Sequence, residues 1–236
     1  MTKPINNDAD AVFTKNWNVY NKMIAHNYMF HREFINEINR VIDTMPVSQP
    51  LTVLDLGCGD AALFSKVLER RPIALYVGYD TSAEVLRYAA ASLQGLKADT
   101  RLVNDYLQNA TTIEQEPFDL VYSSFAIHHL QEEQKIRFFR EAYDRLLAPG
   151  GVFVYVDVLR ADGQPRSEYL EAYVNNMAAK WIALDQLEFK LIEDHIRAYD
   201  FPMEKGKLTT LLRETGFSVS EPALFDGMHS ILVLRK

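Results

Sequence analysis

The stretch with the residue types and spacing of a ligand-binding loop is LTVLDLGCGD, residues 51–60. An apolar run ends at Asp55, and Gly57 and Gly59 then flank a cysteine. Glycines at this spacing let a chain turn tightly and let its backbone approach a ligand. The continuation GCGDAA also fits the dinucleotide fingerprint with alanine in its last place, and Asp80 supplies the acid that such a site needs about 20 residues further on. Spacing alone therefore admits the pyrophosphate of NAD.

The carboxylates around this loop favour a different ligand. A pyrophosphate is an anion held by backbone N–H groups at a helix N-terminus, yet Asp55 and Asp60 bracket the place where it would lie. Like charges at short range in a partly buried site repel strongly. A ligand with a positive centre and an ammonium group would be attracted instead, and S-adenosylmethionine has both and no phosphate. Charge therefore favours S-adenosylmethionine over NAD.

Motifs along the chain resemble one enzyme family. The stretch VLDLGCGDAALF resembles the cofactor loop of class I S-adenosylmethionine-dependent methyltransferases, with Ala61 in the place of the third glycine. Four further stretches resemble that family in the same order: GYDTS, NDYL, FDLVYSSFAIHHL and LLAPGGVFVYVD. The resemblance covers residues 51–158, and the C-terminal end fits too. It implies a Rossmann-like fold, S-adenosylmethionine as cofactor and methyl transfer as the activity.

The resemblance also implies roles for acidic residues at successive strand ends. Asp55 is expected near the cofactor amino group, Asp80 on the ribose hydroxyls, and Asp105 near the adenine amino group with Tyr106 beside it. Cys58 is expected to pack beside the cofactor, because the sequence shows no paired base that would make it a nucleophile. The expected cofactor-binding set is Asp55, Gly57, Cys58, Gly59, Asp80, Thr81, Asp105, Tyr106, Ser124, Phe125 and Arg32.

The hydrophobic pattern alternates between strands and helices. Short apolar or β-branched runs predict strands at 51–56, 73–79, 100–104, 118–123 and 152–158. Helices are expected between them at 61–70, 81–93 and 131–147. A capping box from Thr81 to Glu84 opens the second of these helices. Such alternation predicts an α/β, Rossmann-like fold with a mostly parallel sheet covered on both faces.

The C-terminal end indicates how this sheet finishes. A helix is expected over 207–214, with Gly216 suited to its C-terminal cap. Two strand-like runs then surround Asp226-Gly227, a dipeptide typical of hairpin turns. We therefore expect seven strands, the last two forming an antiparallel hairpin.

Two segments fall outside this alternation. Residues 1–10 are polar and expected to be frayed, and apolar residues then recur at helical spacing from Trp17 until shortly before Pro46. We interpret 1–46 as an N-terminal helical lid whose helix is broken once. We expect residues 47–236 to form the methyltransferase domain, with one or two helices inserted after its fifth strand at residues 160–205.

The candidates for a general base are His129, His26 and Tyr28, since a base is needed if the acceptor is a hydroxyl or a protonated amine. For His129, the alternative is that it packs beneath the cofactor while His128 caps the next helix. We expect no metal, because adjacent residues on a helix or strand point apart and no further ligand cluster is evident. Arg32 on the lid is a candidate partner for the cofactor carboxylate.

Composition limits the classes of partner. The net charge of −7 disfavours a nucleic-acid substrate, and no apolar run is long enough to span a bilayer. One cysteine and the absence of a signal-peptide pattern favour a cytoplasmic location. We expect a monomer or homodimer that methylates a small molecule by in-line displacement, mainly through proximity and desolvation. The alternatives are an NAD-dependent oxidoreductase and a catalytically silent cofactor-binding subunit.

Overall fold

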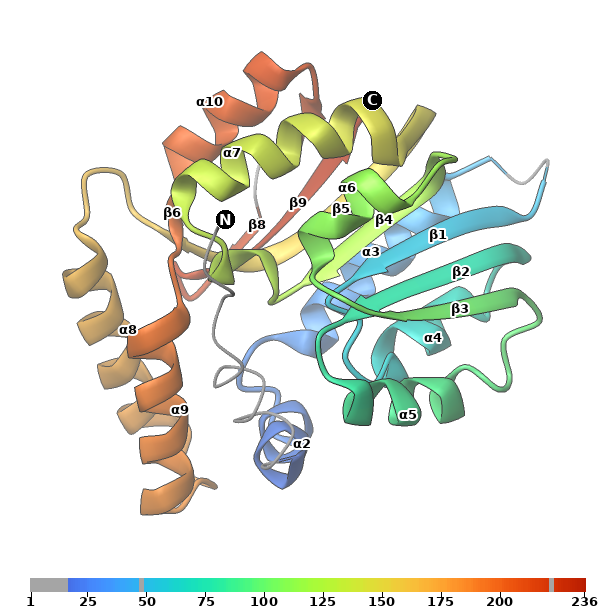
Figure 1. Ribbon diagram of the computed structural model, residues 1–236. Helices are drawn as coiled ribbons and strands as arrows, with labels where there is room; N and C mark the ends of the chain where they lie inside the picture. Colours follow the sequence, from blue (N-terminus) through green and yellow to red (C-terminus); the bar gives the residue numbers. More distant parts are fainter. Residues whose placement is uncertain (1–16, 47–48, 221–222) are drawn as a thin grey trace.

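The structure, a computed structural model, describes residues 17–46, 49–220 and 223–236 (Figure 1). Seven strands of its sheet follow the order β3-β2-β1-β4-β5-β9-β7. The first five pair in parallel, whereas β9 is antiparallel to both β5 and β7. These strands are β1 (Leu51–Leu56), β2 (Ile73–Asp80), β3 (Asp99–Asn104), β4 (Phe118–Ser124), β5 (Leu147–Arg160), β7 (Ser218–Val219) and β9 (His229–Arg235). The predicted fold, with its antiparallel C-terminal strands, is confirmed.

Two short strands extend the sheet. β6 (Met203–Glu204) pairs with the end of β5, and β8 (Ala223–Phe225) pairs with the start of β9. The turn between β8 and β9 contains Asp226 and Gly227, with φ of 50° and 80°. The predicted hairpin therefore forms at this dipeptide, which tolerates the left-handed backbone that a tight hairpin requires.

The central strands are buried on both faces. In β1, Val53 belongs to the apolar cluster on one face, while Leu54 belongs to the cluster on the other. The same alternation recurs in β5, where Val154 packs with Val53 and Phe153 packs with Leu54. Successive strand residues point to opposite faces, so burial of both faces requires a nearly continuous apolar run. This requirement explains the strand sequences LTVLDL and VFVYVDV.

Helices supply the cover on each face (Figure 1). The cluster with Leu54 includes residues of α7 (Glu132–Glu141) and α10 (Lys205–Thr215). The cluster with Val53 includes residues of α3 (His31–Thr44), α4 (Ala62–Leu68) and α5 (Ala83–Ser92). Short helical turns occur at η1 (Leu107–Asn109), α6 (Ala110–Ile113), η2 (Ile127–His129) and η3 (Ala142–Leu146). Within the described ranges, no helix combines the length and apolar character needed to cross a membrane.

The N-terminal segment is split into two helices. A turn separates α2 (Trp17–Ala25) from α3, and in it Asn27 and Phe30 have φ of 55° and 59°. Left-handed backbone at two positions is incompatible with a continuous right-handed helix. The expected break is therefore present. The frayed end expected for residues 1–10 lies outside the described residues.

The segment after β5 forms two helices, α8 (Arg166–Lys180) and α9 (Gln186–Tyr199), which extend beyond the sheet (Figure 1). Their apolar residues form a third cluster that also contains Val19 and Met23 of α2. Lys22 on α2 pairs with Glu188 on α9 at 2.6 Å. We call α2, α8 and α9 together the helical cover, because they form one layer beside the carboxyl ends of the strands.

Two predicted boundaries are wrong. Ser82, not Thr81, caps α5: its backbone is extended and its Oγ accepts a hydrogen bond from the Val85 N–H at 3.3 Å. The helix expected to reach residue 147 ends at Glu141 and continues only as the turn η3. Leu147 already pairs with β4, so β5 begins earlier than its β-branched run suggests.

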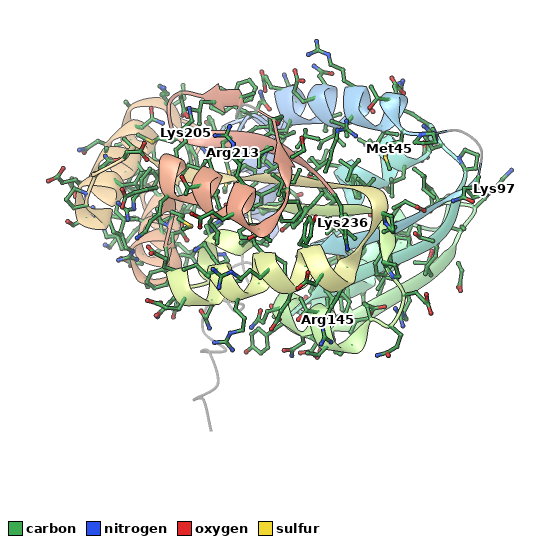
Figure 2. All side chains as sticks on the ribbon, turned by 90° about the horizontal axis from the view of Figure 1, so that it is seen from above. Met45, Lys97, Arg145, Lys205, Arg213 and Lys236 are labelled. Carbon is green, nitrogen blue, oxygen red and sulfur yellow. The ribbon has the colours of Figure 1, made fainter. Side chains whose placement is uncertain are left out.

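The C-terminal residue ties the last strand to this early start of β5. The Nζ of Lys236 donates to the Leu147 carbonyl oxygen at 2.9 Å. The same ammonium lies 5.1 Å from the centre of the Tyr143 ring. Lys236 is labelled in Figure 2. A cation over an aromatic face adds a modest attraction, and this contact fastens the end of β9 beside η3.

The packing of α3 makes the stability of the fold depend on pH. Burial lowers the pKa of His31 from 6.5 to about 4, and His229 adds to this effect. Between these values the folded chain binds fewer protons than the unfolded chain, so the contribution is complete above pH 6.5 and is lost as the pH falls. We expect the free energy of unfolding to drop by about 3 kcal/mol across this window because of His31.

Urea unfolding of the wild type and His31→Leu at pH 7 and pH 4 measures this contribution as a difference in pH dependence. His26→Leu is the matched control, because His26 is exposed. Identical pH dependence in the wild type and His31→Leu would contradict the prediction.

Candidate functional site

A cavity of about 260 Å³ lies at the carboxyl ends of the parallel strands. Strands β1 and β4 are neighbours, and the helices that follow them pack on opposite faces. Such a reversal is where open α/β sheets bind ligands. The sheet side of the cavity includes Gly57, Gly59, Asp80, Thr81, Asp105, Tyr106, Ser124, Phe125, His128 and His129. The helical cover and the chain next to it contribute Tyr20, Met23, Tyr173, Trp181, Ile192, His195, Ile196 and Asp200.

The glycine loop after β1 is hydrogen-bonded to the end of β2. The Gly57 and Cys58 N–H groups both donate to the Tyr79 carbonyl oxygen, at 2.8 and 2.9 Å. The Gly59 N–H donates to the Asp80 carboxylate at 3.0 Å. A phosphate site needs backbone N–H groups that point at the ligand, whereas these three are already bonded within the protein. The loop geometry therefore adds to the charge argument against a pyrophosphate.

Two positions in this loop have left-handed backbone with close neighbours. Gly57 has φ of 75°, and a Cβ placed on it would lie 2.4 Å from the Cβ of Ala126. Ala61, in the third-glycine place, has φ of 54°. This conformation costs a residue with a Cβ roughly 1–2 kcal/mol. The alanine therefore retains the backbone shape that glycine would adopt without strain.

Acidic side chains at the ends of β2 and β3 face the cavity. Asp80 Oδ2 accepts from Gly59, and its Oδ1 accepts from the Ser82 N–H at 2.9 Å. Asp105 Oδ1 accepts from the Tyr106 N–H and from the Asn109 amide, each at 2.7 Å. Backbone donors hold both carboxylates in one orientation. Each carboxylate still has acceptor capacity for a ligand.

Asp55 and Cys58 lie behind the loop and are not among the residues that line the cavity. The Tyr76 hydroxyl donates to Asp55 Oδ2 at 2.7 Å. Burial raises the pKa of Asp55 to about 7, against the effect of the Tyr76 hydrogen bond and with further increases from Asp80 and Asp60. Burial also raises the pKa of the Cys58 thiol well above its usual value. Any influence of these two groups on a ligand would therefore pass through the loop.

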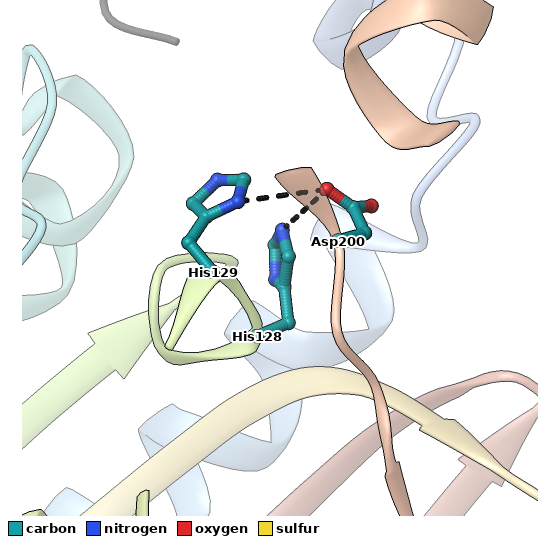
Figure 3. Close-up of side chains that lie close together, drawn as sticks. All are labelled: His128, His129 and Asp200. Carbon is teal, nitrogen blue, oxygen red and sulfur yellow. Dashed lines mark ion pairs between the residues drawn. The ribbon is translucent and has the colours of Figure 1, made fainter. Parts of the chain in front are cut away.

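The turn η2 brings a histidine pair against a buried carboxylate (Figure 3). His128 Nδ1 is 2.5 Å from Asp157 Oδ1, and its Nε2 is 3.4 Å from Asp200 Oδ1. His129 Nδ1 is 3.5 Å from the same Asp200 oxygen and 3.1 Å from the Tyr199 carbonyl oxygen. The two rings converge, with centroids 4.0 Å apart. The expectation that they point apart is wrong, because η2 is a tight turn.

The protonation of this group is uneven. Burial lowers the pKa of His128, but Asp157 and Asp200 outweigh it and raise that pKa to about 10. For His129, burial is again the largest effect and, with His128 beside it, lowers the pKa to about 3. Burial also lowers the pKa of His195 to about 4. At neutral pH the proton therefore resides on His128, and His129 is a neutral ring facing the cavity.

Comparison with known proteins identifies the family. A family described as a methyltransferase domain matches residues 54–153. An uncharacterized methyltransferase of Mycobacterium tuberculosis is 30% identical over 154 residues, which cover 60% of this chain and 70% of that protein. The chain belongs to the class I S-adenosylmethionine-dependent methyltransferases. An uncharacterized methyltransferase of Geobacillus kaustophilus is 31% identical over 141 residues, and the match covers 60% of this methyltransferase and 62% of the relative.

Solved structures share the fold of this methyltransferase. The putative methyltransferase in a Haloferax volcanii complex with the Trm112 methyltransferase activator has a TM-score of 0.63 at 16% identity, over 98% of both chains. An S-adenosylmethionine-dependent methyltransferase from Mesorhizobium loti has a TM-score of 0.57 at 21% identity, over 85% of this chain and 96% of that one. An O-methyltransferase family protein from Burkholderia thailandensis has a TM-score of 0.61 at 16% identity, over 88% of this chain and 58% of that one. At these identities the likeness shows the fold alone.

The three functional residues predicted in the N-terminal segment, His26, Tyr28 and Arg32, do not line the cavity. Arg32 is exposed and donates to the Ala25 carbonyl oxygen. Tyr28 stacks on Trp181 with ring centroids 5.2 Å apart, and His26 in turn stacks on Tyr28. Tyr28 therefore supports a cavity wall from outside. Among the three predicted catalytic residues, His129 lines the cavity and the other two do not.

A buried polar chain in the methyltransferase was missed by sequence reasoning. The hydroxyl of Tyr173, a cavity residue, is 2.9 Å from His229 Nε2, and His229 Nδ1 is 3.0 Å from Asp226 Oδ1. The available signal was a histidine and a serine opening an otherwise apolar strand, directly after a hairpin dipeptide. Asp200 was equally hard to recognise, since its histidine partners lie far away in the sequence.

The contrast between the two loop glycines gives a stability prediction. Gly57→Ala should destabilise the methyltransferase by about 3 kcal/mol, because left-handed strain combines with overlap against Ala126. Gly59→Ala should cost only about 1 kcal/mol, because its φ is 54° but no atom lies within 4 Å of the added Cβ. Denaturant unfolding of both variants measures the difference. Equal destabilisation would rule out the Ala126 contact as the cause.

Proposed function

We propose that this methyltransferase transfers the methyl group of S-adenosylmethionine to a small molecule enclosed in the cavity. The observation that supports this most directly is the position of the cavity between the strand ends and the helical cover. Sheet loops bound the cavity on one side and the helical cover bounds it on the other, around a space of about 260 Å³. Cofactor and acceptor would share this space, which favours a compact acceptor over a macromolecular surface.

The carboxylates suit the cofactor in different places. Asp80, held by two backbone donors, would accept hydrogen bonds from the ribose hydroxyls. Asp105 and Tyr106, one strand further toward the edge, would surround the adenine. Ser124 and Phe125 follow β4, the neighbour of β1, and would lie beside the methionine part. Asp55, behind the loop, would add negative potential toward the cationic cofactor when it is ionised, and its pKa of about 7 leaves it partly ionised at neutral pH.

The acceptor would enter from the helical cover. Met23, Trp181 and Ile196 give this side an apolar wall, Tyr173 adds a hydroxyl group, and His129 faces them from the sheet side. Pockets with mostly apolar walls and a few placed polar groups select small molecules by shape and orient them by hydrogen bonds. The proposed acceptor is therefore a partly apolar molecule whose nucleophilic oxygen, nitrogen or carbon faces the histidine side.

Methyl transfer of this kind needs no covalent bond between the substrate and the protein. A lone pair or electron pair of the acceptor forms the bond to the methyl carbon, the carbon–sulfur bond breaks, and its electrons neutralise the sulfonium. Holding the reactants in line and keeping water away can supply most of the rate. His129 is the predicted catalytic residue that reaches the cavity. Its low pKa suits accepting a hydrogen bond from the acceptor better than holding a proton.

The other candidate functions have less support. An NAD-dependent oxidoreductase needs the phosphate cradle whose N–H groups are already bonded to β2. A catalytically silent subunit would have no need for the retained set of Asp55, Gly57, Gly59 and Asp80. A cytoplasmic location and a monomeric or homodimeric state stay predictions.

Ligand-induced stabilisation distinguishes the cofactors. S-adenosylhomocysteine at 100 times its dissociation constant should stabilise the fold by about 2.7 kcal/mol, because ligand that binds only the folded state shifts unfolding by mass action. NAD at the same concentration should leave the melting temperature unchanged. Differential scanning fluorimetry with both ligands is the measurement. A shift with NAD and none with S-adenosylhomocysteine would reject the proposal.

The ribose contact predicts a specific loss of affinity. Asp80→Asn should weaken S-adenosylhomocysteine binding by about 10- to 100-fold, because it removes charge-assisted hydrogen bonds worth about 1.5–3 kcal/mol. Asp43→Asn is the control, since it removes the same charge from an exposed pair with Arg70. Isothermal calorimetry gives both affinities. Unchanged binding by a folded Asp80→Asn protein would contradict the assigned role.

A further inference from the structure

Two distances within the group of His128, His129 and Asp200 are close to those between ligands around one metal ion. Asp200 Oδ1 lies 3.4 Å from His128 Nε2 and 3.5 Å from His129 Nδ1, and the three atoms all lie within 4.8 Å of one another. Bonds of about 2.0–2.2 Å from one ion to nitrogen and oxygen ligands place neighbouring ligand atoms roughly 3.0–3.4 Å apart. His195 Nε2, at 3.9 Å from the same Asp200 oxygen, lies at the margin of the group.

Asp157 gives His128 the orientation that a metal ligand requires. Asp157 Oδ2 accepts a hydrogen bond from the His128 backbone N–H at 2.9 Å, and Asp157 Oδ1 lies 2.5 Å from Nδ1 of the His128 ring. With Nδ1–H donating to a carboxylate, Nε2 is the nitrogen that presents its lone pair toward Asp200. Metal-binding histidines are commonly held in this way, by a carboxylate on the ring nitrogen that does not bind the metal.

The surrounding charges leave room for a cation. Asp157 and Asp200 are both buried carboxylates, and the nearest buried ammonium is that of Lys135. Its Nζ donates to the carbonyl oxygens of His128, Leu130 and Phe201 rather than to either carboxylate. The partly buried guanidinium of Arg166 is a second cation that interacts with Asp200. A proton on His128 or a bound ion would each add positive charge between the two buried carboxylates.

We propose that His128, His129 and Asp200 form a binding site for one divalent transition-metal ion. Two imidazoles and one carboxylate suit first-row ions such as Fe²⁺, Mn²⁺, Co²⁺ and Zn²⁺, and such sets leave coordination positions open. The ion would replace the contact between His129 Nδ1 and the Tyr199 carbonyl oxygen.

The position of the site suggests its use. All three ligands and His195 line the cavity, where the sheet side meets the chain next to the helical cover. The open positions would therefore take an oxygen or nitrogen donor of the acceptor and fix it before methyl transfer. This second statement rests on the proposed function, whereas metal binding itself does not.

Cobalt titration tests the site without relying on activity. Untagged protein treated with a chelator and then dialysed should bind one Co²⁺ per chain by calorimetry, with visible absorption bands from nitrogen and oxygen ligation. His129→Asn should weaken Co²⁺ binding by about tenfold or more. It is the preferred variant because His129 is only partly buried and its loss disturbs the core least. Asp200→Asn should have the same effect.

His26→Asn is the matched control, since His26 is an exposed histidine outside the group and should leave Co²⁺ affinity unchanged. Absence of binding by the wild type, or equal affinity in His129→Asn and His26→Asn, overturns the proposal. S-adenosylhomocysteine titrated into the metal-free protein separates the two ideas. Cofactor binding without Co²⁺ binding would reject the metal site alone, and Co²⁺ binding without cofactor binding would reject the proposed function.

Discussion

The Tyr79 carbonyl oxygen accepts two consecutive amides, those of Gly57 and Cys58, and this double hydrogen bond determines the shape of the site. It draws the loop after β1 across the end of β2. Gly57 is thereby pressed against Ala126, and Gly59 reaches the carboxylate of Asp80. Three strand ends, those of β1, β2 and β4, are thus joined before any ligand binds. The cavity wall on the sheet side inherits the rigidity of the sheet.

The opposite wall depends on different forces. The helical cover is held by an apolar cluster, by stacking of Tyr28 on Trp181, and by the ion pair between Lys22 and Glu188. A partly exposed ion pair adds little stability, so the cluster provides most of the attachment. In the proposed function, the sheet side would recognise the cofactor and the helical cover the acceptor. That division agrees with the family resemblance, which stops near residue 158 and leaves the insert uncovered.

The elements that could be predicted from the sequence are those for which a local pattern has one physical meaning. Continuous apolar runs gave the parallel strands, and Asp226-Gly227 gave the hairpin. Sequence reasoning failed where the outcome depends on which distant groups meet. Nothing local reveals that Asp200 lies against His128, or that His229 bonds Tyr173 across 56 positions. The same limitation applies to Asp55: the motif marks it as important, but only the structure reveals its hydrogen bond to Tyr76 and its place outside the residues that line the cavity. Adjacent histidines were misjudged because the rule for helices and strands was applied to a turn.

Ala61 illustrates how the loop is tied to the rest of the molecule. Its left-handed backbone is unfavourable for alanine, yet its methyl group is buried in the same apolar cluster as Phe34 and Phe64. Packing against α3 and α4 therefore offsets the strain at Ala61. The conformation of the loop depends on these helices more than on the preferences of its own residues. Mutations in the apolar faces of α3 and α4 would then alter ligand affinity before they unfold the chain. The backbone conformation of the ligand-binding loop therefore depends on how the hydrophobic core beneath it is packed.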